Sequence, residues 1–216
     1  MLSSEAFLKQ LRSRTEVATG TEMVVERRAG PLRLSVSAEA GVGGMVWEAA
    51  ATLADWLGRR CEGARVLELG SGTGVLGLCL AQQGAAKVVL TDRFDVLHLL
   101  RASAAANVVA GAKVMVQELS WGGSELEVDV GAGLDWLVAS EVIYNGNLYE
   151  KLLVTIRLLF ERNPKLQMVM SFERRSSEDR WLDMMRATFD RVALHLVSTD
   201  KGKPVAILEC SELKTV

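Results

Sequence analysis

Glycine and aspartate residues form the clearest chemical pattern in the sequence, within VLELGSGTGVLGLCLAQQGAAKVVLTD at residues 66–92. Gly70, Gly72 and Gly74 follow one apolar run, and Asp92 ends the next. Glycines where a strand turns into a helix let a ligand approach the main chain, and the first amides of the helix can donate hydrogen bonds. A carboxylate about 20 residues further on is suited to accept hydrogen bonds from ribose hydroxyls. This spacing predicts a cofactor that contains a nucleoside.

Other reactive side chains show no pattern that supports catalysis. His98 and His195 are far apart in the sequence and lie in apolar patterns, which favours structural histidines over metal ligands. Cys61, Cys79 and Cys210 have neither an even count nor a paired metal spacing, so we interpret them as reduced thiols of an intracellular protein. A G-x-S-x-G nucleophile turn is absent from the sequence.

Composition argues against a nucleic-acid or membrane partner. The formal net charge of −2 gives no general attraction to phosphate polymers. No apolar run approaches the roughly 18 residues that a membrane span needs, and the N-terminus lacks the apolar centre of a signal peptide. We therefore expect a cytoplasmic protein. The basic, amphipathic FLKQLRSR leaves organelle import as an alternative, although Glu5 and Glu16 flank it.

The first predicted elements are a hairpin and a helix. β-branched residues flank the Gly30-Pro31 turn, which predicts an N-terminal β-hairpin. A helix is predicted over residues 45–58, because apolar residues recur at helical spacing and Gly58 is a natural stop. The length suits a single domain, 1–216, with a hairpin extension over 1–44 and a core over 45–216.

Strands and helices then alternate along the chain. The predicted strands are 65–70, 87–92, 112–119, 134–144 and 166–173, and the predicted helices are 75–84, 94–109, 147–162 and 180–190. This alternation predicts an α/β fold with a parallel sheet that is covered on both faces. Two last strands, 192–198 and 204–211, flank the short turn 199–203, so they must be antiparallel. The sheet is thus predicted to be mostly parallel, with a C-terminal antiparallel hairpin.

The glycine motif also resembles that of a known class. LELGSGTGVLGL has the E-x-G-x-G-x-G form typical of S-adenosylmethionine-dependent methyltransferases with the seven-stranded, Rossmann-like fold, rather than the G-x-G-x-x-G form of dinucleotide dehydrogenases. GGMVWEAAATLADWL, VVLTD, ELSWG, DWLVASEVIY and SFERRSSEDRWLDMM are similar in order and interval to motifs of the methyltransferase-like (family 16 type) protein-lysine methyltransferases. That family acts on non-histone proteins such as chaperones and translation elongation factors. The resemblance covers about residues 40–190.

The resemblance implies a set of contacts with S-adenosylmethionine. Its residues are Trp47, Glu68, Gly70, Ser71, Gly72, Gly74, Asp92, Trp121 and Ser140. The loop at 70–72 would contact the methionine part, and Asp92 the ribose. Trp121 would flank the adenine, Trp47 would form part of the wall closing over the cofactor, and Ser140 would lie beside it. Simple core packing is the alternative for both tryptophans, because large aromatic side chains bury well without a ligand.

The motif SEVIY carries the implied methyl transfer. In the family an acidic residue, two apolar residues and a tyrosine form the acceptor pocket here, and Glu141 and Tyr144 match them. A lysine amine has a pKa of about 10.4, so its deprotonation at pH 7 costs about 4.6 kcal/mol. Glu141 would capture and aim the ammonium, Tyr144 would orient it, and an apolar channel would lower its pKa. Glu141 could instead cap the next helix or pair with an arginine.

The sequence also bears on the class of the methyl acceptor. The N/D-P-P-Y/F motif of many enzymes that methylate nucleic-acid amines is replaced by SEVIY, so nucleic acid is not the expected substrate. Enzymes that methylate small molecules need an enclosed acceptor pocket, which usually includes a longer N-terminal lid. The short N-terminal hairpin of this chain therefore favours a protein acceptor. A non-catalytic interaction module is the third alternative, and the intact glycines and Asp92 argue against it. We expect a monomeric enzyme whose partner is a non-histone protein with an acceptor lysine.

Overall fold

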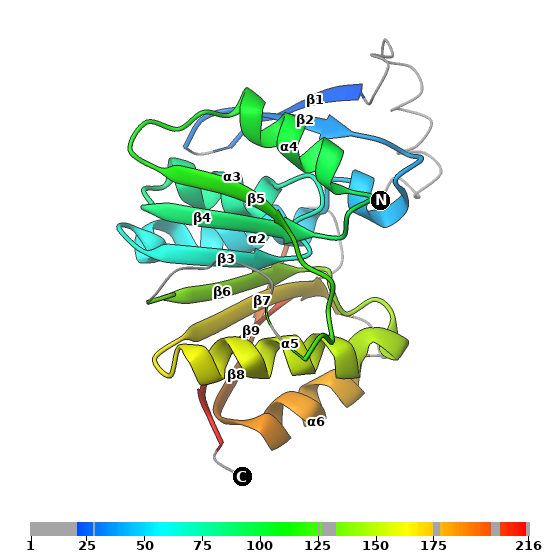
Figure 1. Ribbon diagram of the computed structural model, residues 1–216, viewed down its shortest axis with the longest axis vertical. Helices are drawn as coiled ribbons and strands as arrows, with labels where there is room; N and C mark the ends of the chain where they lie inside the picture. The colour runs from blue at the N-terminus through cyan, green and yellow to red at the C-terminus, as the bar shows by residue number, and fades with distance from the viewer. Residues whose placement is uncertain are drawn as a thin grey trace.

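A seven-stranded β-sheet forms the middle layer of the structure (Figure 1). The computed structural model describes residues 21–27, 29–124, 126, 133–174, 178–199 and 204–214. In spatial order the strands are β5 (Lys113–Glu118), β4 (Lys87–Asp92), β3 (Arg65–Leu69), β6 (Trp136–Ser140), β7 (Gln167–Glu173), β9 (Val205–Leu213) and β8 (Phe189–Val197). The first five strands in this order pair in parallel, whereas β9 runs antiparallel between β7 and β8. The predicted fold class is therefore confirmed, with its C-terminal antiparallel hairpin.

Chain order reverses at the centre of this sheet. β3 pairs with β4 on one side and with β6 on the other, so the connections that follow β3 and β6 leave in opposite directions. In open α/β sheets, a crevice forms outside the carboxyl ends of the strands at such a point. Residues 70–74 follow β3, and residues 141–144 follow β6. The topology thus brings both motifs to one crevice.

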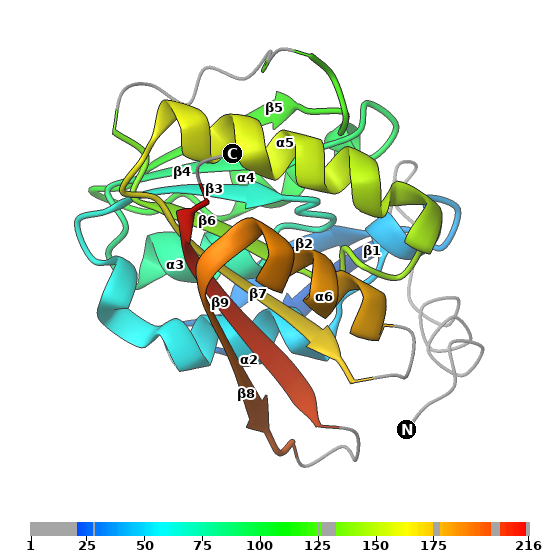
Figure 2. The same ribbon diagram turned by 90° about the horizontal axis from the view of Figure 1, so that it is seen from below.

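Helices cover both faces of the sheet, as Figure 2 shows for α2 and α3 against α5. The helices are α2 (Glu48–Leu57), α3 (Val75–Gln82), α4 (Leu97–Ala106), α5 (Tyr149–Arg162) and α6 (Asp179–Thr188). Buried residues of α2, α3 and α4 share one hydrophobic core cluster, and those of α5 and α6 share another. Strands buried on both sides explain the continuous apolar runs of the sequence. Among the helices of the described residues, none has the length and apolar character that crossing a membrane requires.

The predicted N-terminal hairpin is present and packs on α4. β1 (Thr21–Val25) and β2 (Leu32–Val36) pair antiparallel as a separate two-stranded sheet. The outer edge of β2 is bound by helix side chains: the Arg33 amide donates to Asn107 Oδ1 at 2.9 Å, and the Ser35 amide donates to Ser103 Oγ at 2.9 Å. The hairpin is thereby fixed beside the short 3₁₀ helix η1 (Gly41–Gly44), which leads into α2. Residues 1–20, including FLKQLRSR, and residues 200–203 of the predicted turn lie outside the described residues.

The cysteine side chains are buried, whereas both histidines are exposed. All three cysteines are unpaired and buried, and burial raises the pKa of each thiol to about 12, so none is a reactive thiolate at neutral pH. His195 Nε2 lies 2.9 Å from Glu209 Oε1, and its ring packs near Trp56. Within the described part of the chain, no group of His, Cys, Asp or Glu is arranged to hold a metal ion.

Candidate active site

A cavity of about 350 Å³ opens at the carboxyl ends of β3, β4 and β6. This volume lies within the range of small-molecule sites, about 300–1,000 Å³. Most of the sequence-predicted site residues line it: Trp47, Glu68, Gly70, Ser71, Gly72, Asp92, Trp121, Ser140, Glu141 and Tyr144. The structure therefore brings together the two motifs and both tryptophans, which are separated by up to about a hundred residues in the chain.

The glycine loop is shaped by left-handed backbone and close packing. Gly70 has φ 64° and Gly72 has φ 54°, a region that favours glycine. A Cβ at Gly70 would lie 2.8 Å from Val142 Cγ1 and 3.3 Å from Trp121 Cζ2, and a Cβ at Gly72 would lie 3.0 Å from the Gly43 carbonyl oxygen. Side chains at either position would therefore displace the surrounding wall of the cavity.

Gly74 differs from the other two glycines. It precedes α3 with φ 89°, and a Cβ there would meet Leu100 and Leu78. This environment gives Gly74 a packing role at the start of the helix. Its predicted contact with the cofactor stays a prediction.

Asp92 is fixed at the cavity wall by main-chain amides. The Gly72 amide donates to Oδ2 at 2.7 Å, and the Arg93 amide donates to Oδ1 at 2.8 Å. Burial raises the pKa of the Asp92 carboxyl, and these two hydrogen bonds oppose that effect. A carboxylate oxygen has more than one lone pair, so each oxygen can still accept a further donor. Asp92 is thus oriented in advance for a pair of hydroxyl groups.

Glu68 and Ser71 hold the loop from beneath. Glu68 is 2% exposed and accepts the Gly77 amide at 3.0 Å. Burial raises its pKa to about 8, with the charge of Asp92 adding to the effect, so Glu68 is mostly protonated at neutral pH. Ser71 Oγ accepts the Thr91 amide at 3.0 Å, which ties the loop to β4. These hydrogen bonds give both residues a supporting role, and their predicted contacts with the cofactor stay predictions.

The two tryptophans stand in different parts of the wall. Trp47 precedes α2, is partly buried, and donates from Nε1 to the Val42 carbonyl oxygen at 3.0 Å. Trp121 is also partly buried and lies against Gly70. Its turn is anchored to α5, because the Gly122 amide donates to Thr155 Oγ1 at 3.0 Å. Both side chains therefore line the cavity instead of being enclosed in the core.

The strand β6 ends where the candidate acceptor pocket begins. Ser140 is its last residue, and its hydroxyl shares a 3.0 Å hydrogen bond with Ser171, which donates to the Ala49 carbonyl oxygen at 2.8 Å. The predicted strand over 134–144 is shorter than expected, because Glu141 adopts φ 54°. A left-handed backbone at a non-glycine residue costs free energy of order 1–3 kcal/mol and is concentrated at functional sites.

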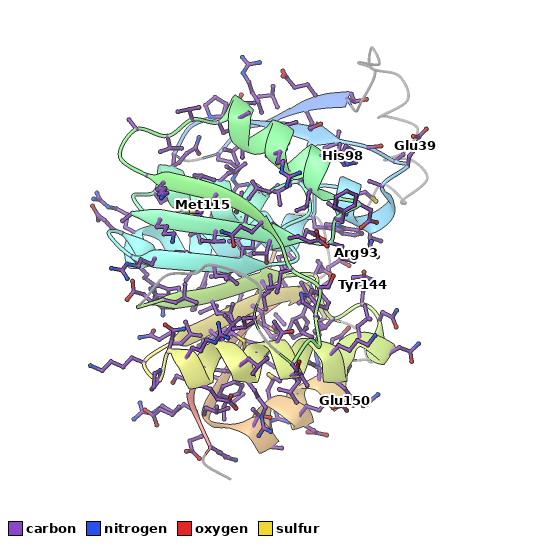
Figure 3. The ribbon with its side chains drawn as sticks, viewed as in Figure 1. Glu39, Arg93, His98, Met115, Tyr144 and Glu150 are labelled. Atoms are coloured by element: carbon purple, nitrogen blue, oxygen red, sulfur yellow. The ribbon has the colours of Figure 1, made fainter. Side chains whose placement is uncertain are left out.

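Glu141 and Tyr144 differ in exposure. Glu141 is 8% exposed, and its Oε1 accepts the Glu173 amide at 2.5 Å. Tyr144 is 51% exposed at the cavity mouth. Figure 3 places Tyr144 and Arg93 on the same side of the molecule, at the carboxyl ends of the strands. A buried carboxylate and an exposed tyrosine in the same cavity are suited to receive a cationic side chain from outside.

Several further residues line the cavity that were not predicted as site residues. They are Val42, Gly43, Met45, Thr73, Arg93, Val96, Leu119, Ser120, Leu148 and Lys151. Lys151 lies in the first turn of α5, and a Cβ on Gly122 would be 2.8 Å from its Cγ. Arg93 forms an ion pair with Asp95 at 3.0 Å. Their positions depend on the paths of connecting segments, which no local pattern encodes.

Fold and site together define an α/β enzyme of the methyltransferase class. The lysine methyltransferase family model matches residues 27–188, and the chain belongs to this family. It is therefore a protein-lysine N-methyltransferase, and its cofactor is S-adenosylmethionine.

Relatives in the family differ in their named substrates. METTL21A of Danio rerio, a protein N-lysine methyltransferase, is 32% identical over 162 residues, which are 72% of each chain. METTL23 of Homo sapiens, a histone-arginine methyltransferase, is 30% identical over 158 residues, 70% of this chain and 80% of that protein. EEF1A lysine methyltransferase 3 of Mus musculus is 34% identical over 123 residues, 55% of this chain and 51% of that protein.

A solved structure shares the fold. Magnesium protoporphyrin IX methyltransferase from Synechocystis PCC 6803, with bound SAM, superposes with a TM-score of 0.55 at 17% identity, covering 75% of this chain and 78% of that one.

Proposed function

We propose that this enzyme methylates a lysine side chain of a non-histone protein, of the chaperone or translation-factor type. The observation that carries the proposal is Glu141, a buried carboxylate that lines the cofactor cavity together with Tyr144. The names of METTL21A and of the EEF1A enzyme support a lysine acceptor, and the latter supports an elongation factor. METTL23 makes histone arginine the competing acceptor.

The family and its named members favour lysine over arginine as the acceptor that Glu141 binds. An arginine guanidinium is a planar fork that prefers two parallel hydrogen bonds to a carboxylate, whereas an ammonium is a compact point charge. Oε1 of Glu141 already accepts the Glu173 amide. This hydrogen bond leaves the carboxylate able to accept an ammonium, and the names of METTL21A and of the EEF1A enzyme favour lysine as its source.

The proposed cofactor contacts follow the shape of the cavity. We assign the methionine part to the loop 70–72, the ribose to Asp92 and the adenine to Trp121. Trp47 forms part of the covering wall, and Ser140 lies beside the cofactor. The fit is supported by the fixed carboxylate of Asp92, by the volume of about 350 Å³, and by the SAM bound in the Synechocystis protein. S-adenosylmethionine supplies a transferable methyl group on a sulfonium.

The remaining chemistry is positioning by the residues of this chain. The acceptor ammonium must lose a proton, at a cost of about 4.6 kcal/mol at pH 7 for an unperturbed lysine. Apolar walls such as Val142 disfavour the charged form, while Glu141 holds the nitrogen in place. Tyr144 orients the nitrogen so that it lies in line with the methyl group and its leaving sulfur. We further propose that the enzyme acts as a monomer in the cytoplasm.

A substrate panel tests this function. Purified enzyme and isotopically labelled S-adenosylmethionine are incubated with elongation factor 1A, a cytosolic chaperone, core histones and a small amine such as pyridine. We expect label in elongation factor 1A or the chaperone, with the Asp92→Ala variant as the control for the cofactor site. Label confined to histones or to pyridine would refute the proposed acceptor class.

A further inference from the structure

Three large hydrophobic side chains are exposed on segments that border the cofactor cavity. Val42 is 45% exposed, Phe94 is 73% exposed and Tyr144 is 51% exposed. Val42 and Tyr144 line the cavity, and Phe94 follows Arg93, which lines it as well. The three belong to η1, to the β4–α4 connection and to the segment after β6. These residues are referred to below as the apolar rim.

The apolar rim combines exposed apolar side chains from three segments that border the cofactor cavity. The other exposed large hydrophobic residues of the described chain lie elsewhere: Val24 on β1, Val108 after α4, Val154 on α5, and Leu194 and Leu196 on β8. Exposed apolar groups beside a cleft mark binding surfaces more often than singly scattered ones do. Arg93 next to the rim is paired with Asp95, so this charge is balanced locally.

We propose that the apolar rim is the docking surface for the substrate protein, and that it takes an exposed aliphatic or aromatic side chain beside the target lysine. This inference rests on the proposed function. The stem of a lysine is only four carbons long, so a protein whose amine reaches Glu141 must lie against the cavity mouth. That position covers Val42 and Tyr144 and brings the substrate surface next to Phe94. Burying these side chains then contributes to affinity through the hydrophobic effect.

Substitution of Phe94 tests docking of the substrate protein separately from catalysis. Its side chain is mostly exposed, and the cavity is lined by its neighbour Arg93 and not by Phe94 itself. Substitution there leaves the core and the cofactor cavity intact. Val108 is a matched control, because it is 89% exposed and lies past the far end of α4.

The experiment measures docking on a mixture of proteins, so the substrate protein does not have to be purified. A soluble protein extract, freed of small molecules by gel filtration, is titrated into enzyme and labelled S-adenosylmethionine, and the initial rate of label incorporation into protein is followed. Wild type, Phe94→Ser, Phe94→Leu and Val108→Ser are compared. The dissociation constant of S-adenosylmethionine is measured by calorimetry for each.

We expect Phe94→Ser to raise the apparent KM for the extract about tenfold, with the cofactor dissociation constant unchanged. Phe94→Leu should recover most of this loss, and Val108→Ser should match wild type. Wild-type KM in Phe94→Ser, or an equal loss in Val108→Ser, overturns the docking surface and leaves the proposed function standing. No incorporation of label into protein by the wild-type enzyme refutes the proposed function itself, and the docking surface with it.

Discussion

Asp92 shows how a single residue can be both ligand contact and scaffold. Its two oxygens already accept the amides of Gly72 and Arg93, so the carboxylate needs little reorganisation when a ribose arrives. Hydrogen bonds to a charged group contribute more than neutral ones. The same bonds hold the glycine loop against β4. Loss of this side chain should therefore weaken binding of the cofactor.

Asp92→Ala should weaken binding of S-adenosylmethionine by about 1.5–3 kcal/mol, roughly 10- to 150-fold. The reason is the loss of charge-assisted bonds to the ribose together with the bond to the Gly72 amide. Calorimetric titration measures the change, and circular dichroism confirms that the variant is folded. Unchanged affinity would remove Asp92 from the cofactor site.

Glu141 and Tyr144 separate acceptor capture from cofactor binding. Glu141→Ala should retain most cofactor affinity but lower kcat/KM for the protein substrate at least about 30-fold, because a buried charge partner is lost. Glu141→Gln is the matched control, since its amide oxygen can still accept the Glu173 amide while the charge is absent. It should be nearly as inactive as Glu141→Ala. Simultaneous loss of cofactor binding and activity would make Glu141 a structural residue.

Tyr144→Phe keeps the aromatic ring at the cavity mouth and removes only its hydroxyl. If that hydroxyl orients the acceptor nitrogen, turnover should fall about tenfold, equivalent to about 1.4 kcal/mol. Steady-state kinetics with the protein substrate gives the value. Wild-type turnover would limit Tyr144 to shaping the channel and the apolar rim.

At the scale of elements, the segment from β2 to α2 forms part of the cavity wall beside the glycine loop. The Ser37 amide donates to the Gly44 carbonyl oxygen at 3.1 Å, and Trp47 bonds to Val42. Gly43 approaches Gly72 closely. The hairpin that precedes this segment is fixed to α4, because Arg33 and Ser35 of β2 bind Asn107 and Ser103, which lie about 70 residues further along the chain.

Gly44→Ala tests the importance of this segment. A Cβ there would lie 1.9 Å from the Ser37 carbonyl oxygen, so the main chain must move, at a cost of typically about 1–3 kcal/mol. We expect a lower melting temperature and about tenfold weaker cofactor binding, measured by thermal denaturation and calorimetry. Gly146→Ala is the control: a Cβ there meets nothing within 4 Å and should be neutral. Wild-type affinity in Gly44→Ala would show that the segment does not shape the site.

The regular elements could be predicted because their causes are local. Buried parallel strands give continuous apolar runs, and Gly58 ends α2 with φ 52° as its position predicts. The crevice could be predicted for the same reason, because Gly70 follows β3 and Asp92 ends β4. Helix and strand ends were less accurate: the predicted helix over 94–109 is limited to Leu97–Ala106. There the Asn107 side chain binds Arg33 of β2, which is a tertiary contact.

The rest of the site depends on contacts between distant segments. Val42 lies on the segment that follows the hairpin, which docks on α4. Lys151 lies on α5 against Gly122, whose amide donates to Thr155 of the same helix. Glu141 adopts its left-handed backbone directly after β6, where its amide donates to the Ser171 carbonyl oxygen of β7. Local sequence patterns do not predict such contacts between distant segments.

For the whole molecule, Glu68 links stability to pH. Its pKa is about 8 in the folded protein against an ordinary 4.5, so the unfolded chain ionises first as pH rises. Its contribution to stability is therefore fully present below about pH 4.5 and is lost as pH rises to about 8. Glu68→Gln keeps an acceptor for the Gly77 amide and lacks this dependence.

The melting temperature of wild type relative to Glu68→Gln should accordingly fall between pH 5 and pH 8.5, with each 1 kcal/mol corresponding to about 2–4 °C. Differential scanning calorimetry at both pH values measures the difference. A difference that is independent of pH would mean that Glu68 is ionised in the folded protein throughout this range.

The most direct test of the enzyme's chemistry is tandem mass spectrometry of a protein substrate methylated with isotopically labelled S-adenosylmethionine. An acceptor pocket for lysine predicts that every labelled methyl group is on a lysine Nζ, and that Glu141→Gln lowers the yield at least about 30-fold. Labelled methyl groups on arginine guanidinium nitrogens, or a full yield from Glu141→Gln, would contradict the proposed acceptor pocket.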